Sequence, residues 1–447
     1  MNKKLLAAAV ASAFAAPAFA QTANNVVLYG RLNVGLDNAK ATGSYFNDSA
    51  VAGGPGHSLD WKDRNRVWDT GSRLGVRGTE DLGNGLRAIF QIESGLNANN
   101  GQSASEANQY NTSAGTLASR PSWVGLEGGW GRVQFGRQDI YWGGGTIEQV
   151  GANYVNTDIP WLTNNSGRVS AGTARQSNVV SYTSPTVGGA NVSVYYSPDT
   201  GVSGNLSGSS QETAGPGKNT NARLQAATAR WAGGPFQAQY DFVYKQQATD
   251  FTTGGPGATN GNGQAKVWAH KVLFGWMYVP GGQLSIIGTH IINAGVTGID
   301  LLGSQTLKQD TLSLSWEHLL NGNILLLAQA GHQFNARGCD GTTSPVAATV
   351  GGATNYTQAC LHSGATAYMA GVRYNLSKRT GVYVTYNHMQ NQQNSFADYA
   401  GGAYAVASNG GPPAVPGTLA APGASGPGAA GKGEQISIFA IGIQHNF

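Results

Sequence analysis

The chain ends on QISIFAIGIQHNF, residues 435–447, and this stretch decides how the rest of the sequence is interpreted. One face of the extended segment carries Phe439, Ile441, Ile443, His445 and Phe447. The alternate residues are small or polar. A period of two predicts a β-strand rather than a helix. One apolar face with a terminal aromatic is typical of a wall between lipid and water, although a half-buried strand of a soluble sandwich would fit this segment equally well.

The same alternation recurs along the chain, which we divide from Val26 onward into sixteen extended segments. The clearest spans residues 236–245, where aromatic and apolar residues at even positions alternate with Gln237, Gln239, Asp241 and Lys245. Residues 221–231 and 283–293 do not indicate which face is apolar. Repeated two-residue periodicity predicts an all-β fold.

The connections between these segments alternate strictly between short and long. The short ones are residues 81–85, 128–131, 185–190, 232–235, 280–283, 320–323 and 376–380. The long ones are residues 38–63, 98–119, 140–176, 198–220, 248–264, 294–308, 336–364 and 391–433. Short connections would all lie at one end of the sheet and long ones at the other. This arrangement is expected of a 16-stranded antiparallel transmembrane β-barrel, with short periplasmic turns and long extracellular loops, and not of a soluble sandwich.

Composition and the N-terminus agree with this fold. Charged residues make up only 11% of the chain, about half the usual share, and glycine occurs 66 times. Lys3 and Lys4, the apolar run 5–14 and Ala18-Phe19-Ala20 predict a signal peptide over residues 1–20, leaving a barrel over 21–447. The run is too short for a membrane anchor. A net charge of +4 gives no indication of a nucleic-acid partner.

Three arginines are predicted at one depth of the barrel interior. Arg31, Arg73 and Arg137 each lie six residues from a short-turn end, which is a rise of roughly 15 Å and near the middle of the apolar band. Strict alternation groups Arg137 with Phe135, so an inward Arg137 requires an irregularity at Gly136. The alternative for each arginine is an ordinary solvated or ion-paired wall residue.

Other charges are placed by the same counting. Arg77 and Arg87 are predicted at the periplasmic mouth, and Glu93 is predicted as an acidic residue of the lumen. The loop 140–176 is the candidate for the side opposite the arginines, where it would create a transverse field. Its acidic candidates are Asp139 at the root, Glu148 and Asp158. The alternative is an ordinary surface loop.

The sequence shows no catalytic or metal site. The eight histidines have no metal-ligand spacing, and no phosphate-binding loop is recognisable, so we expect no cofactor, no metal and no enzymatic activity. Cys339 and Cys360 lie in one loop of a chain expected in an oxidising compartment, and a disulfide is favoured over a metal site or a nucleophile. The proline- and glycine-rich residues 391–433 are predicted to be a long external loop.

Several motifs resemble those of the general porins of Gram-negative bacteria, with the betaproteobacterial branch most similar. They are residues 27–31 (VLYGR), 72–83 (SRLGVRGTEDLG), 88–95 (AIFQIESG), 133–138 (VQFGRQ) and 442–447 (GIQHNF). The resemblance implies a homotrimer of sixteen-stranded barrels whose third long loop folds into the lumen as a constriction. It also implies that Arg31, Arg73 and Arg137 form the basic side, and that Phe447 is the signal recognised by the barrel-assembly machinery.

Two departures affect the predicted constriction. Thr183 stands where some relatives have a further basic residue, and the Pro-Glu-Phe-Gly-Gly loop tip of enteric relatives is absent. The resemblance therefore does not decide whether Glu148 or Asp158 faces the arginines.

These observations predict an outer-membrane porin, a passive channel for small hydrophilic solutes and ions. Anions are favoured because the arginines outnumber the loop carboxylates. The expected partners are further copies of the chain, outer-membrane lipid and lipopolysaccharide, the assembly machinery and small anionic or neutral solutes. The alternatives are a substrate-selective anion channel and, from another class, a β-rich surface adhesin or structural protein.

Overall fold

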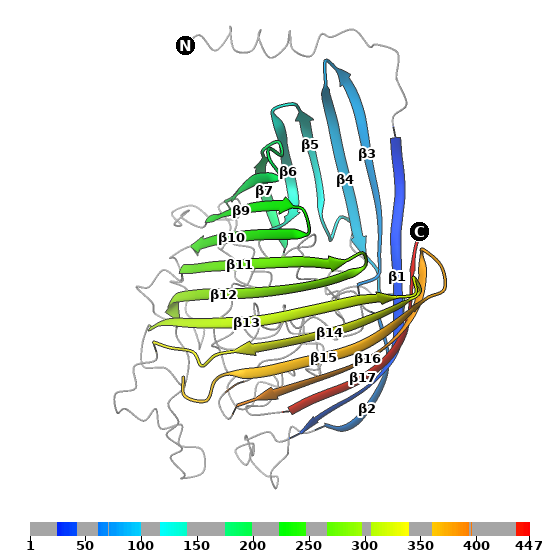
Figure 1. The fold of residues 1–447 in the computed structure, drawn as a ribbon. Helices are drawn as coiled ribbons and strands as arrows, with labels where there is room; N and C mark the ends of the chain where they lie inside the picture. The colour runs from blue at the N-terminus through cyan, green and yellow to red at the C-terminus, as the bar shows by residue number, and fades with distance from the viewer. Residues whose placement is uncertain are drawn as a thin grey trace.

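The computed structural model describes residues 25–42, 61–69, 71–99, 117–140, 175–198, 223–246, 266–296, 305–338, 360–392, 395 and 435–447. These residues form one sheet of seventeen strands in which every pairing is antiparallel and the first strand meets the last (Figure 1). Among them, no helix is long and apolar enough to cross a membrane.

The strands follow one another round the sheet in chain order. They are β1 (Asn25–Thr42), β2 (Trp61–Asp69), β3 (Arg73–Gly83), β4 (Leu86–Gly95), β5 (Ser122–Gly128), β6 (Gly131–Asp139), β7 (Arg175–Thr183), β8 (Ala190–Ser197), β9 (Arg223–Gly233), β10 (Phe236–Gln246), β11 (Lys266–Val279), β12 (Gly282–Val296), β13 (Gln305–Leu320), β14 (Ile324–Gln333), β15 (Ala365–Asn375), β16 (Thr380–Asn391) and β17 (Gln435–Asn446).

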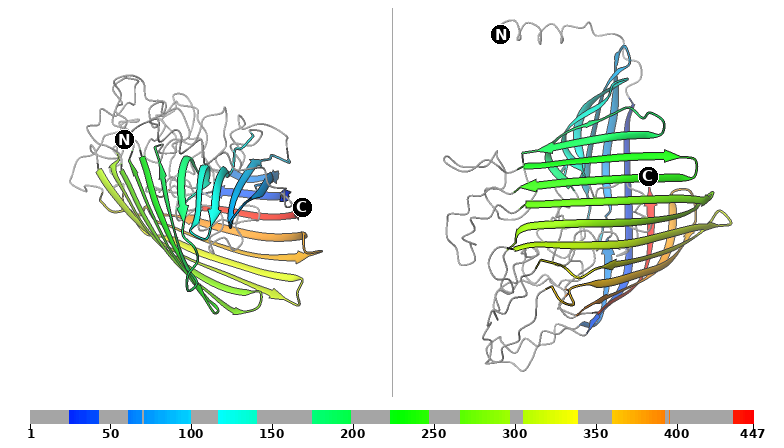
Figure 2. Two further views of the ribbon diagram at one scale, coloured as in Figure 1. Left: turned by 90° about the horizontal axis from the view of Figure 1, so that it is seen from above. Right: turned by 60° about the vertical axis from the view of Figure 1, so that its left-hand side comes forward.

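The seventeen strands form a closed sixteen-stranded barrel because β2 and β3 are two parts of one wall strand. Residues 25–31 of β1 pair with β3, and residues 34–41 of β1 pair with β2. The predicted all-β barrel is thus confirmed. In Figures 1 and 2 the strands from β9 to β17 cross the direction of β3 and β4, which follows from the tilt of strands in a closed barrel.

The C-terminal segment closes the barrel. β17 pairs with β16 on one side and with β1 on the other, where Val34 lies opposite Ile443. Gly30 and Phe447 exchange two backbone N–H to O=C hydrogen bonds of 3.1 Å each. Both ends of the barrel-forming chain therefore meet at the edge that carries the short turns.

Apolar side chains lie on the outer face and polar ones on the inner face. On β17, Phe439 and Ile441 are half exposed, whereas Ala440 and Gln444 are buried. The same alternation continues over most strands, so the outer face is a band of exposed aliphatic and aromatic side chains. Such a surface is stable against lipid and not against water.

Two strands of ambiguous sequence are resolved by burial. In β9 the inner residues include Leu224 and Ala226, and in β12 they include Ile287 and Ile291. These apolar residues face inward, so both faces of these strands carry apolar side chains and the sequence shows no contrast. Ile140, the residue after β6, is buried in a cluster with Leu224 and Ile291, which holds the start of the connection 140–174 near β9 and β12.

The first long connection is shorter than the sequence suggests. β1 continues to Thr42 and β2 begins at Trp61, both inside the predicted loop 38–63. The ladder between β1 and β17 reaches Thr42 and Gln435. Its outward residues there are Asn38 and Lys40, which are polar. Alternating hydrophobicity stops at the edge of the apolar band although the strand continues beyond it.

Candidate pore constriction

A break in the barrel wall separates β2 from β3, and side chains stabilise it. The Asp69 carboxylate accepts the backbone N–H groups of Ser72 at 2.9 Å and of Ala98 at 3.0 Å. The Ser72 hydroxyl accepts the N–H of Asn33 at 2.9 Å. Gly71 has a φ of +67°, a left-handed conformation that glycine adopts without strain. At this break the Gly71 carbonyl accepts a hydrogen bond from a side chain, that of Arg31.

Arg31 and Arg73 lie side by side at this break. They are register partners between β1 and β3, and they alternate with the exposed Leu32 and Leu74, so both belong to the inner face. Arg31 is only 5% exposed and donates to the carbonyl of Gly71 at 3.0 Å. Two adjacent guanidinium groups give this side of the interior a positive potential.

Glu93 and Arg120 extend the basic group. The Glu93 carboxylate forms an ion pair with Arg120 and accepts a hydrogen bond of 3.0 Å from the Tyr29 hydroxyl. Arg73 interacts electrostatically with both Glu93 and Arg120. Glu93 is therefore part of the arginine cluster, which we define as Arg31, Arg73 and Arg120 with Glu93. Two further carboxylates act on these arginines, since Asp69 interacts electrostatically with Arg31 and Asp139 with Arg73.

Sequence reasoning missed two members of this site. Arg120 falls between the predicted loop 98–119 and the strand predicted from Pro121, so it belonged to neither. Tyr29 lies with its ring over Gly75, and the Arg77 guanidinium carbon is 5.3 Å from the centre of that ring. Strand register is the signal that would have identified Tyr29, because Tyr29 is directly opposite Gly75 on β3.

Arg137 occupies the predicted irregularity. The pairing of β6 with β7 shifts between Gly136 and Gln138, and Gly136 has a φ of +136°. Arg137 donates to the Ser119 carbonyl at 3.0 Å and to the Ser177 hydroxyl at 2.5 Å. These contacts attach Arg137 to the residue before Arg120. That all three predicted arginines line one constriction stays a prediction.

Replacing Gly136 by alanine should destabilise this region. A Cβ atom there would lie 2.4 Å from the Ser122 carbonyl oxygen, and its φ is strained for any other residue. We expect a loss of about 1–3 kcal/mol in the free energy of unfolding, measured by urea titration of the folded barrel. Gly129→Ala is the matched control, since its added Cβ meets no atom within 4 Å, and equal losses in both variants would contradict the interpretation.

The remaining predicted charges are paired or lie elsewhere. Asp139 forms an ion pair of 2.8 Å with Arg175 across the two ends of the connection 140–174. Asp139 also interacts electrostatically with Arg73, so this candidate lies near the arginine cluster while it is paired with Arg175. Arg87 forms an ion pair with Glu127 beside the short β3–β4 turn. Glu148 and Asp158 lie outside the described residues, as does most of the loop 140–176.

The predicted disulfide and assembly signal are only partly described. Cys360 is disulfide-bonded, and its predicted partner Cys339 lies outside the described residues. The Phe447 ring lies over Gly30, where any Cβ atom would clash with it. A terminal aromatic in this position completes the seam between β17 and β1. The signal peptide 1–20 and all but three residues of the loop 391–433 also lie outside the described part.

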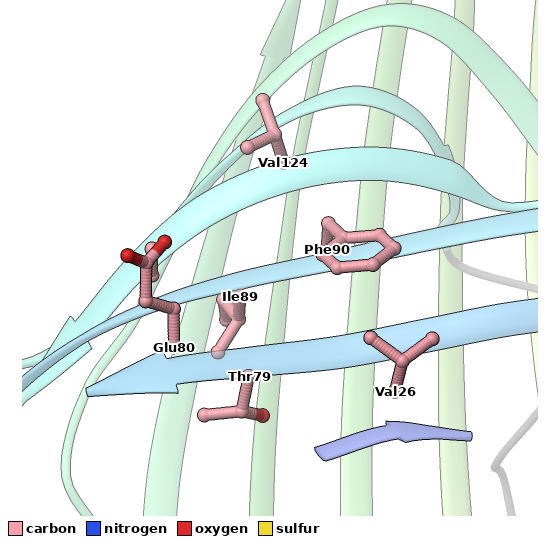
Figure 3. A pocket seen from close by; sticks show the side chains of 7 residues that line it. Val26, Thr79, Glu80, Ile89, Phe90 and Val124 are labelled. Carbon is pink, nitrogen blue, oxygen red and sulfur yellow. The ribbon is translucent and has the colours of Figure 1, made fainter. Parts of the chain in front are cut away.

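A pocket formed by residues of β1, β3, β4 and β5 is separate from the arginine cluster. Figure 3 shows it bounded by Val26, Phe90 and Val124, with Glu80 at one side. Glu80 is seven residues along β3 from Arg73, roughly 23 Å in an extended strand. The lining is mostly apolar and suggests no catalytic chemistry. Within the described residues, no group of three histidine, cysteine or acidic side chains could hold a metal ion.

Sequence comparisons give a consistent family. The model of the family described as Gram-negative porin matches residues 7–394. An outer membrane porin protein of Bordetella pertussis is 36% identical over 208 residues, 44% of this chain and 48% of that protein. The major outer membrane protein P.IB of Neisseria gonorrhoeae is 29% identical over 200 residues, 44% of this chain and 49% of that protein. The chain thus spans about half the length of these two relatives.

Solved structures share the fold. An anion-selective porin from Comamonas acidovorans superposes with a TM-score of 0.57 at 19% identity, covering 95% of this chain and 100% of that one. The trimer form of OmpT, an outer membrane protein of Vibrio cholerae, gives a TM-score of 0.53 at 13% identity, with coverages of 95% and 100%. At these identities the likeness concerns the fold alone.

Proposed function

This chain belongs to the family of Gram-negative porins, and from that premise we propose that it is a passive diffusion channel for small hydrophilic solutes and ions that favours anions. The family and the barrel locate it in the outer membrane. A barrel with an apolar outer face and a polar inner face provides a path for hydrated solutes. Nothing is chemically transformed in this function.

The observation that carries the anion preference is the arginine cluster on the inner face. Arg31, Arg73 and Arg120 lie among the carboxylates of Glu93, Asp69 and Asp139. Arg137 beside Ser119 and Arg175 in its ion pair with Asp139 bring the arginines to five against these three carboxylates, which leaves a local excess of positive charge. A ring or row of arginines attracts anions and repels cations in a narrow opening. The solved Comamonas neighbour is described as anion-selective, which supports the same preference.

We propose that the native form is a homotrimer. The resemblance to general porins implies three barrels, and one solved neighbour with the same fold is described as a trimer. The remaining proposed partners are the outer-membrane lipid, lipopolysaccharide and the assembly machinery that recognises Phe447. Small anionic and neutral solutes would be the transported partners.

Stepwise current through a planar bilayer tests the channel. We expect insertion of the purified, folded protein to give conductance in groups of three equal steps, as three pores of one trimer open. SDS-resistant oligomers that dissociate on heating would accompany them. Folded protein that gives no conductance would contradict the channel function and favour the adhesin or structural alternative.

A substrate-selective anion channel is the second candidate, because the arginine cluster could bind one class of organic anion. It differs in its concentration dependence. One organic acid would then block the chloride current saturably, whereas a general channel shows no saturation with any small anion.

A further inference from the structure

Six of the eight histidines lie on the lipid-facing surface of the barrel, at the two edges of the apolar band. Outward residues alternate with inward ones, and these histidines share the outward positions with exposed residues such as Val272, Leu312 and Tyr386. Both groups of histidines point outward, and they differ in the edge of the band at which they lie. We define the outer row, at the edge with the long loops, as His270, His290, His332 and His388, on β11, β12, β14 and β16. The inner row, at the edge with the short turns, is His318 and His445.

The register of the sheet places the outer row at one level. His270 lies directly opposite His290, and His290 lies opposite Asp310 on β13. His332 lies opposite Leu312, only two residues from Asp310. His332 also lies opposite Thr366, which is two residues from the Tyr368 that faces His388. The row therefore runs across β11 to β16, the strands that lie next to one another in Figure 1.

Each imidazole of the outer row is oriented by a neighbouring strand through its Nδ1 atom. The partners are the Tyr240 hydroxyl at 2.8 Å from His270, the Asp310 carboxylate at 2.5 Å from His290, the Thr366 hydroxyl at 2.8 Å from His332 and the Ser437 hydroxyl at 2.8 Å from His388. In the part of the chain that the structure describes, no hydrogen bond involves the Nε2 atom of any of the four. The outer row therefore presents Nε2 atoms with hydrogen-bonding capacity along one edge.

The surroundings of the outer row are aromatic on one side and basic on the other. The Phe334 ring meets His332 edge-on at 4.7 Å, and the Tyr368 and His388 ring centres are 5.1 Å apart. Aromatic and amphipathic rings are typical of the level where lipid tails meet headgroups. Exposed Lys40, Lys308 and Arg337 lie on the same edge, while Asp310 is already engaged by His290 and Arg337.

We propose that the outer row is a binding site for the phosphate groups of the lipid in the outer leaflet. At His270, His332 and His388 a neutral imidazole whose Nδ1 accepts from the hydroxyl and whose Nε2 carries the proton donates one hydrogen bond to a phosphate oxygen. At His290 the Nδ1–H faces the Asp310 carboxylate, so its Nε2 donates only when the imidazole is protonated, which adds charge to the bond. The row lies at the loop-side edge of the apolar band, where headgroups of the external leaflet are located. The exposed Lys40 and Lys308 add the positive charge that phosphate requires, whereas Arg337 is paired with Asp310. This inference concerns the lipid-facing surface and does not depend on what the channel transports.

Binding of lipopolysaccharide to the folded, full mature chain in detergent tests the proposal. Lipopolysaccharide is titrated in two forms, native and enzymatically dephosphorylated, and the dissociation constants are compared. For the unchanged protein we expect the native form to bind at least tenfold more tightly. The double variant His332→Phe, His388→Phe should weaken binding of the native form about tenfold, because two hydrogen bonds to charged groups are lost, and should leave the dephosphorylated form unchanged.

The inner row supplies the matched control. His318 and His445 also use Nδ1 for a neighbouring hydroxyl, at 2.9 Å each, but they lie at the opposite edge of the band. The double variant His318→Phe, His445→Phe should leave binding within about twofold of the unchanged protein. Heat-modifiable mobility of every variant verifies folding. Equal affinity for the two lipid forms, or equal losses from both double variants, would overturn the proposal.

Discussion

Replacing Arg73 by glutamate is expected to move the chloride-to-potassium permeability ratio of the pore toward potassium by roughly tenfold or more. A unit charge about 4 Å from an ion contributes ~1 kcal/mol in water, and reversing its sign changes the ion's energy by twice that before salt screening. Arg73 lies at the centre of the arginine cluster, next to Arg31 and electrostatically coupled to Arg120. The measurement is the reversal potential in a planar bilayer under a KCl gradient.

Two further variants keep this prediction interpretable. Arg73→Gln removes the charge without placing a second carboxylate beside Glu93, and it should give about half of the shift in free energy. Arg87→Glu is the control, since the Arg87 side chain is 50% exposed and lies beside the short turn in an ion pair with Glu127. A shift as large from Arg87→Glu as from Arg73→Glu would show that overall charge, and not the cluster, sets selectivity.

Replacing Asp241 by alanine is expected to lower the free energy of unfolding by about 3–5 kcal/mol, the usual cost of breaking a buried ion pair by removing one member. Lys271 is fully buried, and its Nζ atom lies 3.0 Å from the Asp241 carboxylate. That carboxylate also accepts hydrogen bonds from the Thr228 hydroxyl at 2.6 Å and the Gln239 amide at 2.7 Å. The network joins β9, β10 and β11 across the inner face.

The double variant Asp241→Leu, Lys271→Met is the control, because it removes both charges of the ion pair together. It should recover most of the stability lost by Asp241→Ala, measured as the urea midpoint of the folded barrel. A double variant as unstable as the single one would mean that packing, and not the loss of the ion pair between Asp241 and Lys271, determines the loss.

The barrel could be predicted from the sequence because its two faces meet different solvents. Phe439, Ile441 and Ile443 alternate with buried residues at the period of a strand, and that contrast repeats around the wall. The alternation of apolar and polar residues disappears where the two faces of a strand no longer separate lipid from water. The inner face of β9 carries Leu224 and Ala226, and β1 beyond Leu36 has left the apolar band.

The site was predicted in part, for a similar reason. Counting from the turns predicted Arg31 and Arg73 at one height, and the two residues are register partners, because regular strands make height proportional to residue number. It did not find Arg120, which joins the cluster through an irregular approach to β5, nor the pairing of Asp139 with Arg175. The histidines that look scattered in sequence form two rows only when register aligns them. Contacts between distant segments depend on pairings that local periodicity does not encode.

The reversal potential of the unchanged protein measures which ion the arginine cluster favours. Purified protein in a planar bilayer, with KCl more concentrated on one side, should give a potential whose sign corresponds to chloride as the preferred ion. A potential near zero, or one that favours potassium, would contradict the account of the arginine cluster even if the pore conducts.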